Sequence, residues 1–513
     1  MGIPTTINMK ADTRDTIVTI LAGKWPLSAK EVYSEVRETQ GLNITYQGVH
    51  KVLNQLVDER TALIQDRKYL LSTEWIENLK KFAETAEKNY LKNKTQTYLE
   101  VGTGSSVEKD AFIAGKEAAG KALKQIKSNK GLRLVLVFAS NIYQKAYGEL
   151  LRGIQSVTKN SPLAGCTTMG GEINNRNLQK SITVMLLAAD KNIFDAEVIA
   201  VRVSDGHYQG NGFSDVLEEL ENKAKLRIDF PDIALVFFPG YLKKFGMRAI
   251  APAFLSELNN RFGASFPLVG CLAGDNWVFE ETAQFCNYTA SSDAIVFVRI
   301  KTKINFGIRK LHAYKPVNNN RYKVKIRNAF IVEMAKVKDD KIQKYQPALD
   351  VYLKETKMTK QELEGALPLF VRELIAQNKA PPITRAIDGA HGYPCFLNEK
   401  SLRFDNLFDN GDIINVSKTS PTEILKTTQK TIEEASQIGK VTKPVAALLF
   451  SCASLEAILN AHNVNEIEII KKSSALQNVP IFGCYNAGEI GPMAVPQGSG
   501  TVVALVFGNE LRD

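Results

Sequence analysis

Long hydrophobic runs are absent from this chain of 513 residues. A membrane-spanning helix needs about 18 to 20 consecutive apolar residues, whereas the longest apolar runs here, at 182–189 and 233–238, have only the length of strands. The N-terminal residues also lack the basic region and the apolar stretch of a signal peptide. These absences predict a cytoplasmic protein without a membrane partner.

Cysteine is also scarce, and its spacing is informative. Zinc sites and disulfide frameworks need closely patterned cysteines, and no Cys-x-x-Cys pair occurs. His391 and Cys395 lie four residues apart, but further ligands at a suitable spacing are missing. We therefore expect neither a metal site nor a disulfide framework. The six cysteines are Cys166, Cys271, Cys286, Cys395, Cys452 and Cys484.

Glycine-rich phosphate-binding loops are missing as well. The segment Gly102–Ser106 lacks the last glycine of a dinucleotide fingerprint and the Lys-Ser/Thr pair of a P-loop. It predicts a loop that follows a short strand at 98–101, and we expect no cofactor.

The remaining composition is that of an ordinary globular protein. Apolar residues make up 44% of the chain and charged residues 23%, close to the average, and the length indicates two to four domains. The net charge of +10 is a mild bias that is compatible with nucleic-acid binding. Residues 1–94 contain 14 Lys and Arg against 12 Asp and Glu, so the N-terminal segment itself is only slightly basic.

Residues 1–75 follow the order of three short helices and a hairpin. Apolar residues recur at helical spacing over 12–22. Ser28 begins a second helix with the pattern of a capping box, and Thr45 begins a third. A short hairpin with a charged tip is expected over 62–72. This order predicts a small domain built around the third helix.

The third helix carries a resemblance to a known family. Residues 45–53, Thr-Tyr-Gln-Gly-Val-His-Lys-Val-Leu, resemble the winged helix-turn-helix domains of prokaryotic transcription regulators. In such domains the third helix lies in the major groove, and cations of the hairpin meet phosphates. The resemblance implies DNA contacts by Gln47, His50, Lys51, Arg67 and Lys68. Alternatively, the domain contacts protein or dimerises, which is favoured by the acidic residues Asp58, Glu59 and Asp66.

A linker helix is expected at 76–97. Trp75, Leu79 and Phe82 lie on one stripe of a helix that continues to about residue 91. Such a stripe usually packs on a domain or on a second copy of itself, so a homodimer is an open alternative.

The rest of the chain contains one pattern three times. An apolar strand is followed by an amphipathic stretch and by Pro-x-x-Gly-Cys, after which the chain turns and returns as another strand. Repeated strand-helix-strand units in mixed sheets predict the α/β fold class. Ligands of such folds favour the loops at the carboxyl ends of strands. The three Gly-Cys turns begin at Gly165-Cys166, Gly270-Cys271 and Gly483-Cys484.

These turns resemble a second family. Gly165–Ile173 resembles the GCSTAGEI signature of FIST sensory domains, with one extra residue. Gly270–Asp275 is similar to the GGxAGD turn of the family, with Cys for the second glycine, and Gly483–Ile490 to its GFYxxGEI signature. Residues 345–352 look like a further family stretch, GxPAxxxY, without its usual Asp-Gly.

The resemblance implies a sensor. FIST domains are regarded as intracellular sensors of small ligands, with amino acids as candidates, and no catalytic activity is attributed to them. A FIST N-terminal domain is implied at 98–312 and a FIST C-terminal domain at 313–513. The family often has an arginine shortly after a cysteine that follows its third strand, but Ser451–Leu455 has none. If that arginine binds an anionic group of the ligand in the family, this chain binds a different ligand or binds it at another position.

The Gly-Cys turns supply the candidates for ligand contact. Converging backbone N–H groups of glycine-rich turns bind anions, and a carboxylate receives an ammonium group, so the turns suit an amino acid. Alternatively, the glycines allow tight turns and the glutamates cap backbone groups. The candidate ligand-binding residues are Cys166, Thr167, Glu172, Asp275, Asn276, Tyr485 and Glu489.

Cysteine at the same place in three copies predicts a small apolar residue beneath a turn. A catalytic thiol needs a base, usually histidine, and the five histidines lie away from the Gly-Cys turns in sequence. We therefore predict a non-enzymatic one-component regulator, in which a FIST ligand sensor is joined to a DNA-binding winged helix. The open alternatives are a signalling scaffold whose winged helix binds protein, redox sensing by the thiols, and a thiol-dependent enzyme built on Cys166 or Cys484.

Overall fold

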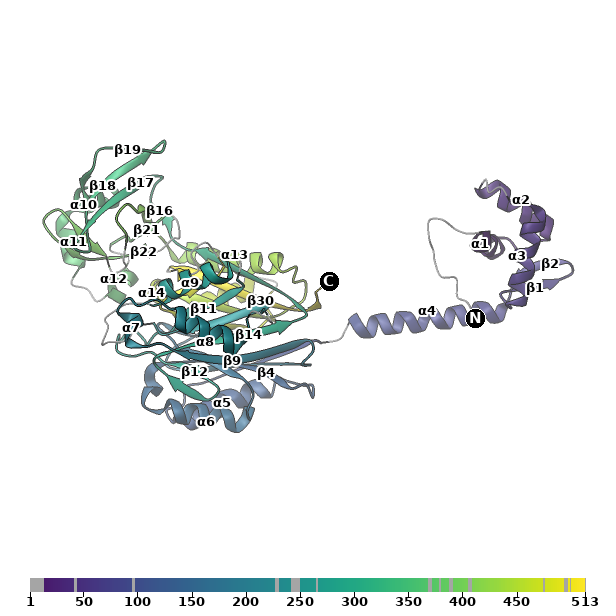
Figure 1. The fold of residues 1–513 in the computed structure, drawn as a ribbon, viewed down its shortest axis with the longest axis horizontal. Helices are drawn as coiled ribbons and strands as arrows, with labels where there is room; N and C mark the ends of the chain where they lie inside the picture. Colours follow the sequence, from purple (N-terminus) through teal and green to yellow (C-terminus); the bar gives the residue numbers. More distant parts are fainter. Residues whose placement is uncertain are drawn as a thin grey trace. The chain divides into compact units, whose positions relative to one another are not determined.

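The chain divides into two compact units, Met1–Gln96 and Thr97–Asp513, and each is described by itself (Figure 1). None of the helices within the described ranges combines the length and the apolar character that crossing a membrane requires. The computed structural model describes residues 13–40, 44–94, 97–226, 230–240, 250–263, 266–367, 371–377, 380–386, 391–404, 408–473, 476–492, 497–498 and 500–512.

The N-terminal unit has its described elements in the predicted order. The capping box before the second helix is formed, because the Ser28 N–H donates to the Glu31 carboxylate (2.7 Å) and the Glu31 N–H donates to the Ser28 hydroxyl (3.3 Å). Thr45 caps the third helix by accepting the Gly48 N–H at 3.2 Å. The elements are α1 (Thr13–Gly23), α2 (Ala29–Gln40), α3 (Tyr46–Asp58), β1 (Ala62–Gln65), β2 (Lys68–Leu71) and α4 (Thr73–Lys94).

The apolar faces of these elements enclose a small core. Ile17, Val32 and Leu53, from α1, α2 and α3, are fully buried in it. Leu27 and Tyr69 exchange backbone hydrogen bonds (3.0 and 2.7 Å), so the segment before α2 is held against the hairpin.

The unit Thr97–Asp513 is built from the three predicted copies, each with an additional outer strand and helix at its start. The described elements of copy 1 are β3 (Leu99–Ser106), α5 (Ala111–Leu123), β4 (Leu132–Ala139), η1 (Asn141–Ala146), α6 (Tyr147–Thr158), β5 (Leu163–Thr167), β6 (Gly171–Asn174), β7 (Asn177–Leu178) and β8 (Ile182–Ala189). Those of copy 2 are β9 (Phe194–Arg202), α7 (Asp205–Tyr208), α8 (Ser214–Ala224), β10 (Ile233–Phe238), α9 (Ala251–Phe262), β11 (Leu268–Leu272), β12 (Gln284–Cys286), β13 (Thr289–Ser291) and β14 (Ala294–Thr302). Those of copy 3 outside its insertion are β15 (Ile304–His312), α13 (Pro421–Ile438), β26 (Pro444–Cys452), α14 (Ala453–Ala461), α15 (Glu466–Ser473), β27 (Ile481–Asn486), β28 (Glu489–Ile490), β29 (Gln497–Gly498) and β30 (Thr501–Leu511).

Within the described ranges, the sheets of the three copies share one strand order. The orders are β13-β12-β5-β4-β8-β3, β29-β28-β11-β10-β14-β9 and β7-β6-β27-β26-β30-β15. In each sheet the Gly-Cys strand lies parallel to the first apolar strand, and a phenylalanine is opposite the cysteine. These pairs are Phe138 with Cys166, Phe237 with Cys271, and Phe450 with Cys484. The sequence repeat is therefore also a structural repeat.

Each of these sheets is completed by a hairpin from another copy. The hairpin of copy 1 pairs through β6 with β27 of copy 3, that of copy 3 through β28 with β11 of copy 2, and that of copy 2 through β12 with β5 of copy 1. The exchange runs in a circle, so each copy is joined to both others by backbone hydrogen bonds.

The segment Gly102–Ser106 was expected to be a loop, and this expectation is wrong, because β3 continues through it. The two glycines allow α5 to approach the strand. A Cβ added to Gly102 would lie 2.1 Å from the Ala122 carbonyl oxygen, and one added to Gly104 would lie 2.0 Å from that of Ala118. The glycines thus serve helix packing rather than a turn.

Copy 3 contains a long insertion between β15 and α13. The insertion forms a sheet of its own with the order β22-β21-β25-β17-β18-β24-β23, and its last helix, α12, packs beside α14 of copy 3 (Figure 1). Its described elements are β16 (Lys315–Pro316), β17 (Arg321–Arg327), β18 (Phe330–Lys338), β19 (Lys341–Ile342), β20 (Gln346–Pro347), α10 (Ala348–Thr356), α11 (Lys360–Ala366), α12 (Val371–Gln377), β21 (Ile383–Arg385), β22 (His391–Gly392), β23 (Pro394–Leu397), β24 (Leu402–Phe404) and β25 (Ile413–Lys418).

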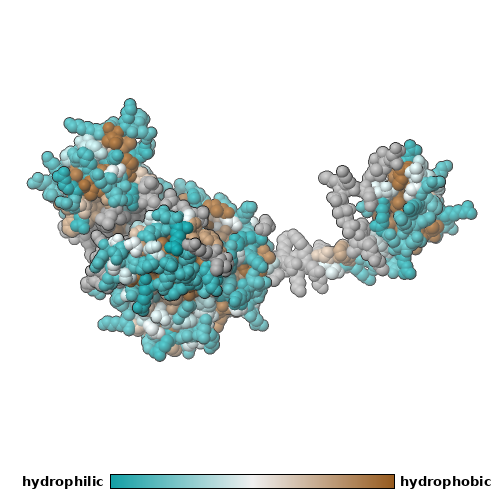
Figure 2. Space-filling view, in the orientation of Figure 1, coloured by the Kyte–Doolittle hydropathy of each residue, from teal (hydrophilic) through white to brown (hydrophobic). Residues whose placement is uncertain are grey.

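The copies meet in a common core. The rings of Phe138, Phe237 and Phe450 lie with their centroids 5.8 to 6.3 Å apart, in edge-to-face arrangements. All three are fully buried. On the face shown in Figure 2, hydrophilic residues cover most of the described surface, and hydrophobic residues form small patches. The apolar side chains of the strands are therefore directed into the core.

Candidate functional site

Glu172 and Glu489 occupy equivalent places in the exchanged hairpins. Glu172 lies opposite Cys484, and Glu489 lies opposite Cys271. The third equivalent place, opposite Cys166, holds Gln284. All three side chains are fully buried.

Both glutamates bind the start of the strand that follows their own turn. The Glu172 carboxylate accepts hydrogen bonds from the hydroxyls of Thr168 (2.7 Å) and Ser181 (2.6 Å) and from the Ser181 N–H (3.3 Å). The Glu489 carboxylate accepts from the hydroxyl (2.7 Å) and the N–H (3.2 Å) of Thr501. Burial raises the pKa of Glu172 to about 7 and that of Glu489 to about 8. These contacts correspond to the alternative in which the glutamates cap backbone groups.

Three other candidate ligand-binding residues also form hydrogen bonds within the protein. Asp275 accepts the N–H groups of the turn residues 279–281 at 2.7 to 3.1 Å. The Thr167 hydroxyl accepts the Ala283 N–H at 3.0 Å, and the Tyr485 hydroxyl donates to Glu466 at 2.7 Å. Ligand contact by these residues stays a prediction, and their observed contacts stabilise the turns.

Cys166, Cys271 and Cys484 meet in the core between the sheets. The Sγ atom of Cys271 lies 3.8 Å from that of Cys166 and 3.9 Å from that of Cys484, and all three side chains are fully buried. Burial raises the pKa of Cys271 and of Cys484. At Cys166 burial opposes ionisation, but hydrogen bonds from the other two thiols lower its pKa. A substrate would reach these thiols only if the core opened.

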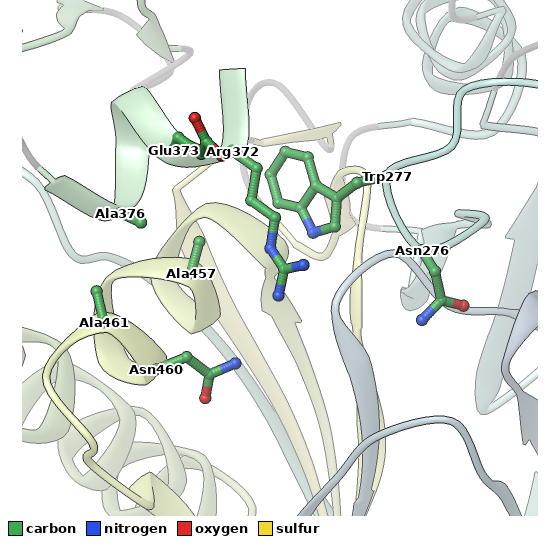
Figure 3. Close-up of a pocket in the computed structure, with 8 residues that line it drawn as sticks. All are labelled: Asn276, Trp277, Arg372, Glu373, Ala376, Ala457, Asn460 and Ala461. Atoms are coloured by element: carbon green, nitrogen blue, oxygen red, sulfur yellow. The ribbon is translucent and has the colours of Figure 1, made fainter. Parts of the chain in front are cut away.

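A cavity of about 510 Å³ lies where the turn after β11 meets α12 and α14 (Figure 3). Its wall combines a cation, a carboxylate, an indole, two amides and three alanines. The lining residues are Asn276, Trp277, Arg372, Glu373, Ala376, Ala457, Asn460 and Ala461. Of the ligand-contact residues predicted from the sequence, Asn276 is the one that lines this cavity.

Asn276 and Trp277 are fixed by contacts behind the cavity. The side-chain oxygen of Asn276 accepts hydrogen bonds from the Ser140 hydroxyl and the Asn141 N–H, both at 3.0 Å. The backbone N–H of Trp277 donates to the Met169 sulfur at 3.3 Å. Trp277 is only 9% exposed, and its indole N–H has no hydrogen-bond partner among the described residues. Figure 3 shows that the indole nitrogen faces the Arg372 guanidinium.

Arg372 extends from α12 toward α14 (Figure 3). No hydrogen bond or ion pair joins its guanidinium to another side chain within the described ranges. Behind the wall, Glu456 of α14 is fully buried and accepts hydrogen bonds from the amides of Gln179 (2.5 Å) and Asn460. Burial raises the pKa of Glu456 to about 7, and the charge of Arg372 opposes this shift. The cavity therefore presents a half-buried cation with a buried acid behind it.

Sequence reasoning missed Arg372, Trp277 and Asn460. Arg372 and Asn460 belong to α12 and α14 rather than to a repeated turn, whereas Trp277 directly follows the predicted Asn276. Within the described ranges, no group of three or more His, Cys, Asp or Glu side chains is arranged to hold a metal ion.

The predicted DNA-contact residues lie on two exposed parts of the N-terminal unit. Gln47, His50 and Lys51 line a shallow hollow along α3, together with Tyr46, Asn54, Gln55 and Asp58. Arg67 and Lys68 are exposed at the hairpin, and the charge of Lys68 acts on Glu31 of α2. The structure thus brings the first three together on one helix face and places the other two on the hairpin.

Comparison with known proteins gives two domain matches. Residues 133–334 match the FIST N domain, and residues 348–492 match the FIST C domain. A search of curated proteins finds no match. Asn276 and Trp277 fall in the first matched range, whereas Arg372 and Asn460 fall in the second, so the cavity lies where the two domains meet.

Proposed function

Because this chain carries a FIST N domain and a FIST C domain, we propose that it is a one-component regulator whose FIST part binds a small ligand and whose N-terminal unit binds DNA. FIST domains indicate a sensory, ligand-binding role in signalling. The finer parts of the proposal are the place of the ligand, the DNA contact and the absence of catalysis. Cytoplasmic location stays a prediction.

The cavity at the meeting of the two domains carries the ligand half of the proposal. Its volume of about 510 Å³ falls in the range of small-molecule sites, about 300 to 1,000 Å³. It combines Arg372 and the Trp277 N–H, which has no partner among the described residues, with apolar surface from three alanines. A few placed polar groups in an apolar wall are typical of ligand sites.

Replacing Arg372 by methionine is expected to abolish ligand stabilisation. A ligand that binds only the folded state stabilises it by about 2.7 kcal/mol at a hundredfold excess over its dissociation constant. The measurement is the thermal shift of the full chain with the twenty amino acids and common carboxylic and phosphorylated metabolites. A ligand that raises the melting temperature of the wild type should leave that of Arg372→Met unchanged.

The proposed DNA binding is assigned to the N-terminal unit. We propose that it is a winged helix-turn-helix domain, with α3 as the recognition helix and the β1–β2 hairpin as the wing. The exposed polar face of α3, with Gln47, His50 and Lys51, suits base and phosphate contacts. The hairpin adds two exposed cations. The competing function, protein contact by the same unit, is favoured by the acidic residues near this face, including Asp58.

Substituting Lys51, Arg67 and Lys68 by alanine together is expected to weaken DNA binding at least about tenfold, because each cation that leaves a phosphate contact costs affinity and lowers the salt dependence. A gel shift with genomic fragments at two salt concentrations measures both effects. The matched control substitutes three exposed lysines of the other unit, Lys109, Lys116 and Lys124. Equal DNA affinity of the triple variant and the wild type would favour the scaffold function.

We propose no catalytic activity for the chain. Cys166 and Cys484 are enclosed by the core, and the described contacts of their thiols are with the third core cysteine rather than with a histidine base. A nucleophilic thiol needs access and a base, so the enzyme alternative has the least support.

A further inference from the structure

The charges around the cavity indicate which part of the ligand is recognised. We infer that the cavity takes a small organic carboxylate, that Arg372 binds its anionic group, and that an amino group on the ligand is not required. This inference rests on the proposed ligand-binding function and names the chemical class of the ligand.

The donors of the cavity converge on one place. A guanidinium stays charged and presents five N–H donors in a plane that matches a carboxylate. Arg372 is half-buried at the cavity, and no described side chain holds its guanidinium. The Trp277 N–H beside it is buried without a described partner, and Figure 3 shows it directed toward the guanidinium. A buried donor without a partner costs about 1 to 3 kcal/mol, so an acceptor that meets both groups removes this cost.

A third donor lies on the opposite wall. The oxygen of Asn276 is engaged by Ser140 and Asn141, which orients the side-chain amide. In Figure 3 its nitrogen faces the space between Arg372 and Asn460. The groups that this part of the wall offers to a ligand are therefore donors, as an anion requires.

The acidic residues near the cavity do not form an ammonium site. Glu456 has one oxygen engaged by Gln179 and Asn460, and its other oxygen is buried without a hydrogen-bond partner among the described residues. A Cβ built on Gly170 would lie 2.8 Å from that second oxygen, so backbone covers it closely. Glu373 is exposed, and Figure 3 shows its carboxylate turned away from the guanidinium. An ammonium group would meet the neutral amide of Asn460 rather than a carboxylate.

Glu456 is a positioning residue in this arrangement. Its buried carboxylate attracts the Arg372 guanidinium, so it draws the cation toward α14 and competes with the ligand for it. Ala376, Ala457 and Ala461 supply the apolar remainder of the wall, which suits a short hydrocarbon chain on the carboxylate.

The test compares ligands that differ in one charge. Calorimetric titration of the full chain would use L-alanine, propionate and L-alaninamide, then L-leucine, 4-methylpentanoate and L-leucinamide, with inorganic phosphate as an anion of another class. Within a set, the amino acid and its des-amino acid are expected to bind within about threefold of each other, and the amide at least about tenfold more weakly, because only the amide lacks the group that Arg372 binds. Binding of both sets should be lost in Arg372→Met and retained in Arg202→Met, the control at an exposed arginine of β9 that does not line the cavity.

A second variant separates the two roles that Glu456 could have. Glu456→Gln is expected to raise the affinity for the amino acid and the des-amino acid alike, by about three- to tenfold, since it removes a charge that competes for Arg372. A loss of affinity for the amino acid alone would show that Glu456 binds the amine and would overturn the inference. An unchanged melting temperature of the free variant shows that its fold is intact.

Three other results would also overturn the inference. The amide could bind as tightly as the amino acid, phosphate could bind more tightly than every carboxylate, or no member of either set could bind. If the metabolite panel then yields an uncharged or phosphorylated ligand that stabilises the protein, the carboxylate class is wrong while the proposed ligand-binding function stands. If no metabolite stabilises the protein, both fail.

Discussion

Replacing Gly483 by alanine is expected to destabilise the protein by at least about 3 kcal/mol, which is the upper part of the range for overpacked cores. Gly483 lies in β27, directly opposite Leu449 of the parallel strand β26. A Cβ added to Gly483 would lie 1.8 Å from the Leu449 carbonyl oxygen and 2.7 Å from its carbonyl carbon. Because these atoms are backbone, no side-chain rotation relieves the clash, and the strands would have to separate.

The same close approach occurs in the other two copies. A Cβ on Gly165 would lie 1.8 Å from the Val137 oxygen, and one on Gly270 would lie 1.9 Å from the Val236 oxygen. The glycine before each repeated cysteine is thus required by strand spacing. Because each Gly-Cys strand also pairs with the hairpin of another copy, separation of one pair of strands disturbs two copies.

Urea unfolding of the full chain measures this effect against a matched control. Gly120 lies inside α5 and has open space around an added Cβ, so Gly120→Ala should stabilise the protein by up to about 1 kcal/mol. Gly483→Ala should lower the unfolding midpoint or prevent folding. A midpoint equal to that of the wild type would mean that the strands of copy 3 are farther apart than the structure indicates.

Raising the pH from 5 to 9 is expected to lower the free energy of unfolding by several kcal/mol. Burial raises the pKa of Glu172 to about 7 and that of Glu489 to about 8, whereas both groups ionise near 4.5 in the unfolded chain. Between pH 4.5 and these folded-state pKa values, the two glutamates therefore hold more protons in the folded state than in the unfolded state. The stabilisation is complete below pH 4.5 and is lost as the pH rises through the folded-state pKa values. Each unit of pKa difference corresponds to about 1.4 kcal/mol, so Glu172 alone accounts for about 3 kcal/mol.

Glu172→Gln is the variant that isolates this effect. The chain itself holds Gln284 at the equivalent place in copy 2, which indicates that an uncharged amide fits the exchanged hairpin. The variant should lose a large part of the pH dependence and be more stable than the wild type at pH 9. Glu218→Gln, at an exposed position of α8, should leave the curve unchanged. If the curve of Glu172→Gln runs parallel to that of the wild type, Glu172 is already ionised in the folded protein at pH 5.

The strands and the repeat could be predicted because their signals are local. An apolar run followed by Pro-x-x-Gly-Cys marks β4, β10 and β26 and the strands that pair with them. The caps of α2 and α3 are likewise set by residues three positions apart. By contrast, the exchange of hairpins joins residues as distant as Glu172 and Cys484, and no periodicity in one segment indicates such a partner.

Most residues that line the cavity could not be predicted for the same reason, because they are distant from one another in sequence. The repeated Gly-Glu-Ile motif pointed to Glu172 and Glu489, but each glutamate binds the strand that follows its own turn. Arg372 reaches the cavity from an insertion of copy 3, and Trp277 reaches it from a turn of copy 2. Their proximity depends on tertiary packing, so of the residues that line this cavity the sequence indicated Asn276, which adjoins a Gly-Cys turn.

We propose that a small ligand binds the folded chain in the cavity lined by Asn276, Trp277, Arg372 and Asn460. The thermal shift of the wild type beside Arg372→Met, with the full metabolite panel, tests it most directly. At least one ligand is expected to raise the melting temperature of the wild type and not that of the variant. A ligand that stabilises both proteins equally would show that the binding site lies elsewhere.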